Sequence, residues 1–184
     1  MKENIVSVAA GLIEKYGLRK FTIDEIAKDL KISKKTIYQH FHSKDEIIRE
    51  FFITTLDSDR NSVISALNSD LNFWDKIHSI IYSNHTYRIP LALLTEAKQF
   101  YPEEWSRIEE LKHFKTRSIQ KLLEQAQADG ILKSEVHFGV LSKMLEEISD
   151  IFIDYDFLLE NKLTTSEAID EALKIVIQGV MKKR

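Results

Sequence analysis

The chain has 184 residues, of which 43% are hydrophobic and 30% are charged, with five glycines, two prolines and no cysteine. The lack of cysteine excludes a disulfide scaffold, cysteine-ligated zinc and a thiol nucleophile, and so few glycines and prolines favour long helices over turn-rich β structure. No charge-free apolar run approaches the roughly 20 residues of a membrane span, so we expect a soluble, cytoplasmic protein.

Charge is unevenly distributed along the chain. Residues 1–50 carry ten basic and eight acidic side chains, whereas residues 51–184 carry 16 basic and 21 acidic ones. A polyanionic partner is therefore plausible only for the N-terminal part, since the field of the rest would repel it.

Three short helices are predicted near the N-terminus. Apolar residues recur at helical spacing over 5–16, and Gly17 follows where a helix often ends. Thr22 and Glu25 form a predicted capping box for a helix over 23–30, and Ser33 can cap a third helix over 34–40.

The remaining sequence is also helical in pattern. Ser43 and Glu46 form a second predicted capping box, and Thr164 and Glu167 another. Apolar periodicity continues through six further segments, at 44–67, 73–81, 91–100, 102–128, 137–160 and 165–181. We therefore predict an all-α fold of about nine helices: an N-terminal helix-turn-helix domain over 1–50 and a C-terminal ligand-binding and dimerisation domain over 51–184.

The second and third helices have the outline of a helix-turn-helix. Ile37 and Phe41 would hold the third helix down, leaving polar groups free to enter a DNA groove, where lysine neutralises phosphate and glutamine or histidine reads base edges. The helix starts at Thr22 and Ser43 offer free amides to phosphate oxygens. The predicted DNA-binding residues are Thr22, Lys34, Lys35, Thr36, Tyr38, Gln39, His40 and Lys44.

Residues 5–52 resemble the DNA-binding domain of the TetR family of bacterial transcriptional regulators. The resemblance rests on AAGLI at 9–13, YG at 16–17, TIDEIA at 22–27 and ISKKTIYQHFHSKDE at 32–46. It implies that the third helix enters the major groove, that Tyr38 and Lys44 contact phosphates, and that the C-terminal domain dimerises and often binds a ligand. One departure is Lys31, which stands where the family often has glycine; a left-handed lysine would cost roughly 1–2 kcal/mol.

Candidate ligand-binding residues are less well specified by the sequence. Tyr82, His85, Trp105 and Phe152 can line an apolar cavity with a few polar groups, although each is also explained as ordinary core. Glu146, Asp150 and Asp154 repeat at i+4 spacing and can form either a cation-binding face or a solvated one. We expect no metal site and no cofactor.

The sequence thus predicts a homodimeric regulator, a repressor by resemblance, that binds a palindromic double-stranded DNA operator, pairs through its last two helices and responds to a small-molecule effector. An alternative is a DNA-bound adaptor of the same fold that recruits a protein partner without an inducer. A helical enzyme or ligand carrier with a vestigial N-terminal motif is the third possibility, but no glycine-rich phosphate loop, HExxH motif or GxSxG turn is present.

Overall fold

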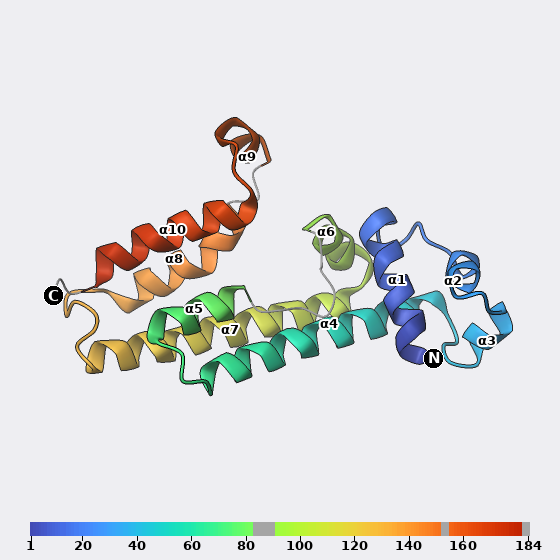
Figure 1. Ribbon diagram of the computed structural model, residues 1–184, viewed down its shortest axis with the longest axis horizontal. Helices are drawn as coiled ribbons and strands as arrows, with labels where there is room; N and C mark the ends of the chain where they lie inside the picture. The colour runs from blue at the N-terminus through green and yellow to red at the C-terminus, as the bar shows by residue number, and fades with distance from the viewer. Residues whose placement is uncertain (83–90, 152–154, 182–184) are drawn as a thin grey trace. The chain divides into compact units, whose positions relative to one another are not determined.

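The computed structural model describes residues 1–82, 91–151 and 155–181, and these contain ten α-helices. They are α1 (Lys2–Tyr16), α2 (Ile23–Leu30), α3 (Lys34–Tyr38), α4 (Lys44–Leu67), α5 (Phe73–Ile81), α6 (Leu91–Phe100), α7 (Pro102–Ala128), α8 (Phe138–Ile151), α9 (Tyr155–Asn161) and α10 (Thr165–Val180) (Figure 1). The all-α prediction is confirmed. None of these helices is long and apolar enough to cross a bilayer.

The helix count differs from the prediction in one place. A single helix was predicted over 137–160, whereas the structure describes two, α8 and α9, on either side of residues 152–154. Residues 140–163 contain neither glycine nor proline, so no helix-breaking residue in the sequence marks where one helix ends and the next begins.

The described residues fall into two compact units. The first unit comprises Met1–Ser69 and Ile81–Lys112, and the second comprises Asp70–Ile80 and His113–Arg184. The first unit therefore extends beyond the N-terminal segment in which DNA binding was predicted, and α4 runs on past residue 50 to Leu67. The predicted functional boundary at residue 50 stays a prediction.

The first unit is built around the apolar faces of α1 and α4. Ile5, Ala9 and Ile13 lie on one face of α1 because of their i+4 spacing, and all are fully buried. They join a cluster in which α4 contributes two adjacent phenylalanines, Phe51 and Phe52, whose ring centroids lie 5.3 Å apart. Two residues of α6, Leu93 and Ala97, belong to the same cluster.

The loop between α1 and α2 ties α6 to this core. Gly17 has a φ of 88°, and its N–H donates to Ile13 O at 2.8 Å, which ends α1. The next N–H, of Leu18, donates to Glu96 Oε2 on α6 at 2.9 Å. The positive φ favours glycine at residue 17, and a Cβ there would lie 2.7 Å from the other oxygen of Glu96, so a larger residue would displace this carboxylate.

The second unit packs α5, the C-terminal part of α7, α8 and α10. Its buried side chains follow helical spacing: Ile119, Leu123 and Ala126 on α7; Leu141, Leu145 and Ile148 on α8; Ile169, Leu173 and Val176 on α10. The segment after α7 is fixed to the end of α10, since Lys133 Nζ donates to Gly179 O at 2.6 Å. The capping box predicted at Thr164 and Glu167 is present at the start of α10.

Candidate DNA-binding site

The predicted helix-turn-helix is present as α2, a tight turn and α3. The Thr22 hydroxyl accepts the Glu25 N–H at 3.3 Å, and the Glu25 carboxylate accepts the Thr22 N–H at 2.7 Å, which confirms the predicted capping box. Lys31 closes α2 in the left-handed conformation, with φ 54° and ψ 41°, as glycine would. Ser33 then caps α3 by accepting the Thr36 N–H at 3.1 Å.

Helix α3 is held to the core by one side and exposes the other. Ile37 is fully buried, as is Phe41 just beyond the helix, whereas Lys34, Lys35, Tyr38 and Gln39 are exposed. Tyr38 has 48% of its surface exposed, which is high for a tyrosine that packing alone would explain. Thr36 and His40 are half-buried. The helix ends at Tyr38 rather than near His40, so Gln39 is its C-cap and His40 lies in the following turn.

Besides Thr22, two of the predicted DNA-binding residues already have partners within the helix-turn-helix. Lys34 Nζ lies 2.7 Å from Asp24 Oδ1, and this contact raises the pKa of Lys34 above its ordinary value. The Thr36 hydroxyl shares a hydrogen bond of 2.9 Å with the Ser33 hydroxyl. The Lys34–Asp24 pair therefore bridges α3 and α2 at the surface of the helix-turn-helix.

Lys44, at the start of α4, makes contacts within the chain that the sequence did not indicate. Its ammonium donates to Arg19 O at 2.6 Å and to Phe21 O at 2.8 Å, and it lies 4.3 Å from the centroid of the Phe21 ring. Partial burial lowers its pKa below the ordinary lysine value. An ammonium has three N–H groups, so one remains for another acceptor.

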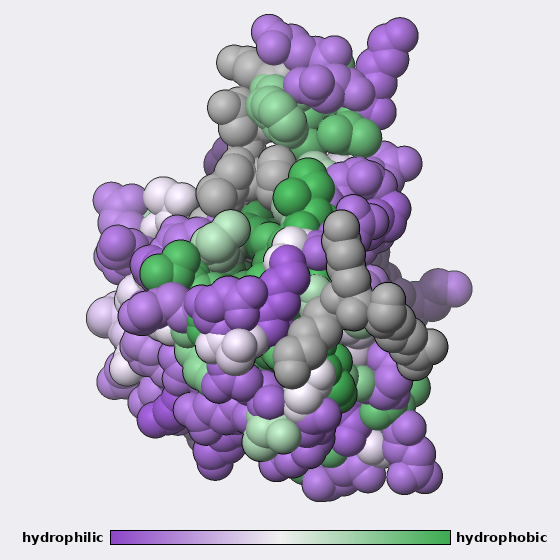
Figure 2. Space-filling view, turned by 90° about the vertical axis from the view of Figure 1, so that its left-hand side faces the viewer, coloured by the Kyte–Doolittle hydropathy of each residue, from purple (hydrophilic) through white to green (hydrophobic). Residues whose placement is uncertain are grey.

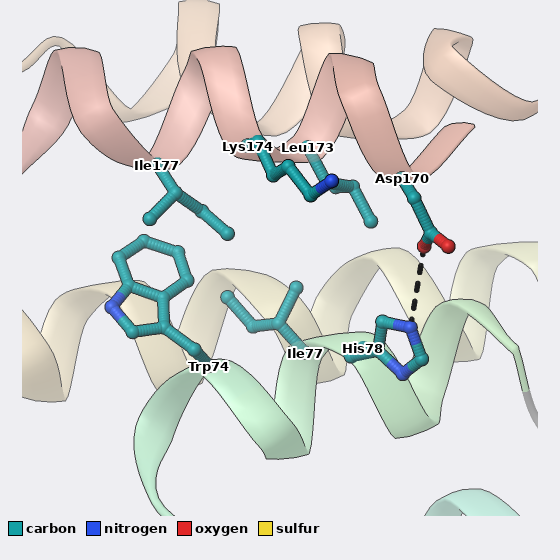
Figure 3. A pocket seen from close by; sticks show the side chains of 7 residues that line it. All are labelled: Trp74, Ile77, His78, Asp170, Leu173, Lys174 and Ile177. Carbon is teal, nitrogen blue, oxygen red and sulfur yellow. Dashed lines mark ion pairs between the residues drawn. The ribbon is translucent and has the colours of Figure 1, made fainter. Parts of the chain in front are cut away.

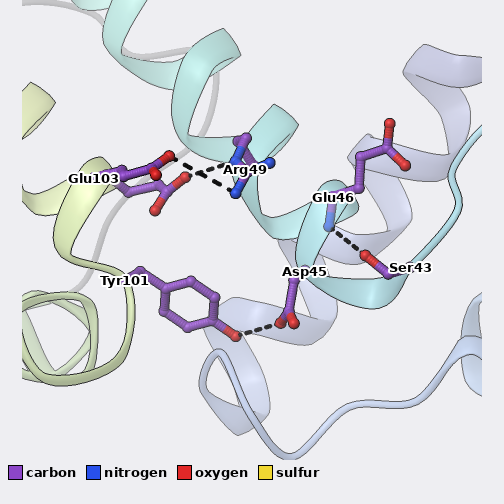
Figure 4. A network of polar contacts seen from close by, with 7 residues as sticks. Ser43, Asp45, Glu46, Arg49, Tyr101 and Glu103 are labelled. Atoms are coloured by element: carbon purple, nitrogen blue, oxygen red, sulfur yellow. Dashed lines mark hydrogen bonds and ion pairs between the residues drawn. The ribbon is translucent and has the colours of Figure 1, made fainter.

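The start of α4 is capped, but the predicted capping box there is incomplete. Ser43 Oγ accepts the Glu46 N–H at 3.1 Å, as predicted (Figure 4). The Glu46 carboxylate, however, accepts the N–H of His42 rather than that of Ser43. The Glu46 carboxylate therefore pairs with the amide of the residue before the cap, and only the Ser43 side chain caps the helix.

Polar contacts join the first turns of α4 to the start of α7 (Figure 4). Tyr101 donates its hydroxyl to Asp45 Oδ1 at 3.0 Å, and burial together with this contact raises the pKa of Tyr101. One turn further along α4, Arg49 Nε lies 3.1 Å from Glu104 Oε1, and Arg49 Nη2 lies 3.8 Å from Glu103 Oε2. The Glu104 side chain is only 4% exposed, so Arg49 supplies the charge that makes burial of this carboxylate tolerable. No local sequence signal indicates these pairs, because their members lie more than 50 residues apart.

Of the four predicted ligand-binding residues, the structure describes Tyr82 and Trp105. Tyr82 is half-buried just after α5, and Trp105 is half-buried against the core of the first unit, with Lys98 Nζ 5.5 Å from its ring centroid. His85 and Phe152 lie outside the described residues, as does Asp154, and the side chains of Glu146 and Asp150 are likewise not described. These assignments stay predictions.

Comparisons with known proteins agree with this geometry. Residues 5–51 match the sequence model of the family described as bacterial regulatory proteins, tetR family. The HTH-type transcriptional regulator YvaF of Bacillus subtilis is 20% identical over 185 residues, which span 98% of this chain and 95% of YvaF. IcaR of Staphylococcus aureus, named as the negative transcriptional regulator of the biofilm operon icaADBC, is 23% identical over 132 residues, or 68% of this chain and 71% of IcaR.

Solved structures share the fold over the whole chain. A TetR-family regulator from Cytophaga hutchinsonii superposes with a TM-score of 0.75 at 13% identity, covering 100% of this chain and 96% of that one. A transcriptional regulator from Saccharomonospora viridis, solved in complex with choline, gives a TM-score of 0.75 at 14% identity and covers 99% and 98%. Residues 5–51 therefore form a TetR-family helix-turn-helix domain, and the relatives that the chain resembles are named as transcriptional regulators rather than enzymes.

Proposed function

We propose that the protein is a homodimeric repressor that places α3 of each subunit in successive major grooves of a palindromic operator. The observation that carries this proposal is the exposed polar side of α3, held in place by buried Ile37 and by the capped helix starts around it. A two-fold dimer presents two such helices and therefore reads two half-sites of matching symmetry.

Each predicted DNA-binding residue has a distinct proposed role. Lys34, Lys35, Thr36, Gln39 and His40 face the groove, where Gln39 is the chief candidate for reading a base edge because it is exposed and carries both a donor and an acceptor. Tyr38 contacts a phosphate through its exposed hydroxyl, and Lys44 does so through the N–H that its two carbonyl partners leave over. Thr22 marks the start of α2, where phosphate oxygens meet the amides that the helix leaves unpaired.

The dimer is proposed to form through α8 and α10. Large apolar side chains on these helices are exposed in the single chain: Val140 by 57%, Met144 by 49% and Ile175 by 71%. The face drawn in Figure 2 likewise shows hydrophobic side chains at its surface among hydrophilic ones. Packing against a second copy would remove these groups from water and yield an intermolecular four-helix bundle.

Repression and its relief are proposed by analogy. IcaR, a relative over two thirds of this chain, is named as a negative regulator, and the S. viridis protein of the same fold is solved with choline bound. A small-molecule effector in the C-terminal domain would release this protein from DNA if it bound unequally to the DNA-bound and DNA-free conformations, with a coupling of roughly 1–3 kcal/mol.

The test is selection of the purified protein on random duplex DNA, followed by salt titration of the selected site and measurement of the molar mass of free protein and complex. We expect a palindromic consensus, one dimer per site and an affinity that falls steeply with salt. Lys35→Met should flatten the salt dependence, whereas Lys121→Met, an exposed lysine on α7, should not. Absence of enrichment at low salt, or an asymmetric site bound by a monomer, would contradict the proposal.

A further inference from the structure

The loop between α1 and α2 is held by side chains of two other helices. The Leu18 N–H donates to Glu96 Oε2 on α6 at 2.9 Å. The Lys44 ammonium, at the start of α4, donates to Arg19 O at 2.6 Å and to Phe21 O at 2.8 Å. Backbone groups in a loop need partners from elsewhere in the chain, so the path of this loop depends on where α6 and α4 place these two side chains.

The Glu96 carboxylate is closely fitted to the loop. Its side chain is half-buried and lies on the face of α6 that carries Leu93 and Ala97, both of which are buried in the core of the first unit. One oxygen accepts the Leu18 N–H, and the other lies 2.7 Å from the position that a Cβ on Gly17 would occupy. The carboxylate therefore packs against the backbone of two consecutive loop residues, and its position follows that of α6.

Two further contacts lie at the same corner of the first unit, where α6 meets α7. The Arg19 guanidinium lies 4.2 Å from the centroid of the Phe100 ring, and Tyr101 donates its hydroxyl to Asp45 Oδ1 at 3.0 Å (Figure 4). Arg19 and Phe100 are both exposed, so their contact joins two side chains that can rotate apart in water. The bond from Glu96, by contrast, reaches the loop backbone itself.

The end of this loop is the start of the helix-turn-helix. Thr22 is the N-cap of α2, so the loop determines where α2 begins. Helix α3 follows α2 through the tight turn at Lys31, and the ion pair between Lys34 and Asp24 joins the two helices at 2.7 Å. A displacement of the loop would therefore move α2 and carry α3 with it.

We propose that Glu96 is a positioning residue for DNA binding: it does not touch DNA, but it holds the loop so that α2 and α3 keep the orientation that fits the groove. The inference rests on the proposed function. It gives α6 a direct connection to the helix-turn-helix, in addition to the connection through α4. A movement of α6 that breaks the bond to Leu18 releases the start of α2 and weakens binding.

The test compares two variants of equal charge in the full chain. Glu96→Gln and Glu96→Ala remove the same negative charge, so any change in electrostatic attraction to DNA is common to both. Glutamine keeps an oxygen that can accept the Leu18 N–H, whereas alanine does not. We expect Glu96→Ala to bind the selected operator about fivefold or more weakly than Glu96→Gln, measured where circular dichroism shows both to be folded.

Two controls separate positioning from other effects. Gln99→Ala truncates an exposed side chain on the same helix and should bind the operator like the wild type. The salt dependence of binding should be the same for Glu96→Ala and Glu96→Gln, because neither variant removes a phosphate contact.

The position of α2 can also be measured without DNA, because the chain has no cysteine. Spin labels on Lys28→Cys, in α2, and Gln99→Cys, in α6, report the distance between these helices by pulsed dipolar spectroscopy. The labelled protein is diluted with excess unlabelled protein so that the distance is measured within one subunit. We expect a narrow distance distribution in the otherwise wild-type chain and with Glu96→Gln, and a broader one with Glu96→Ala.

Equal operator affinities of Glu96→Gln and Glu96→Ala, or equal distance distributions, would overturn the proposal. A lower Tm of Glu96→Ala with unchanged affinity and unchanged distances would make Glu96 a residue of structural importance only, which also overturns it. If the wild type selects no operator, the proposed function fails, while the label distances still decide whether Glu96 positions α2. The two failures are therefore distinguishable.

Discussion

Replacing Lys44 by methionine should destabilise the protein even when no DNA is present. Methionine keeps most of the apolar stem but removes the ammonium that donates to Arg19 O and Phe21 O. Hydrogen bonds to a charged group contribute roughly 1.5–3 kcal/mol each, and the contact with the Phe21 ring adds roughly 0.5–1 kcal/mol. Ordering a lysine costs about 2 kcal/mol, and its partial desolvation offsets a further part, which leaves a net loss of about 2 kcal/mol.

For a chain of this size, that loss corresponds to a Tm lower by about 4–8 °C. Thermal unfolding of the free protein measures it, and amide hydrogen exchange should show faster exchange in the loop that joins α1 to α2. Lys35→Met is the matched control, because this exposed lysine lies in the same domain and should melt like the wild type. If Lys44→Met melts within 1 °C of the wild type and only weakens DNA binding, with a salt slope reduced by about 1.8 because a dimer loses two phosphate contacts, then Lys44 acts solely as a phosphate contact and the reasoning is refuted.

Three further predictions concern the helix-turn-helix and its attachment. Tyr38→Ala should weaken binding to all DNA sequences alike, whereas Gln39→Ala should lose roughly 1–3 kcal/mol of preference at one base position. A competition assay with single-base operator variants measures both effects. If Gln39→Ala weakened binding to all variants equally, Gln39 would not read a base. Lys31→Gly should raise the free energy of unfolding, measured in urea, by about 0.5–1 kcal/mol. Glycine adopts the left-handed conformation without strain, and this gain exceeds the extra chain entropy that glycine loses on folding. An unchanged or lower free energy of unfolding would argue against strain at this turn. Arg49→Met should lower the free energy of unfolding by leaving the buried Glu104 carboxylate without its partner, and adding Glu104→Gln should recover part of the loss in the same urea assay. A double variant no more stable than the single one would exclude this account.

Local chemistry made several helix starts predictable, although not every helix end. Thr22, Ser33, Ser43 and Thr164 all cap helices as their sequence positions predict, because a capping side chain acts on an amide only three residues away. The left-handed turn at Lys31 could also be anticipated, since it follows from where α2 must stop. The groove-facing and phosphate-contacting roles of α3 residues, by contrast, stay predictions until the protein is measured on DNA.

Contacts between distant segments could not be predicted from the sequence. Nothing near Leu18 indicates that its amide meets Glu96, 78 residues away, and nothing near Asp45 points to Tyr101. The same limit applies to the surface hollow that Trp74 and Ile77 of α5 form with Leu173 and Ile177 of α10 (Figure 3), because these two helices lie nearly 100 residues apart in the sequence. Periodicity assigns each residue to a face of its own helix, but it does not say which other helix covers that face.

The hydrogen bond from Leu18 to Glu96 has a consequence for protein engineering. A DNA-binding fragment that ends at residue 50 would lack the Glu96 carboxylate that holds the loop after α1. A fragment that ends at residue 69 would still lack Leu93 and Ala97, which belong to its core. The transferable module is therefore discontinuous, and a chimaera that moves this DNA specificity onto another regulator has to carry residues 81–112 along with residues 1–69.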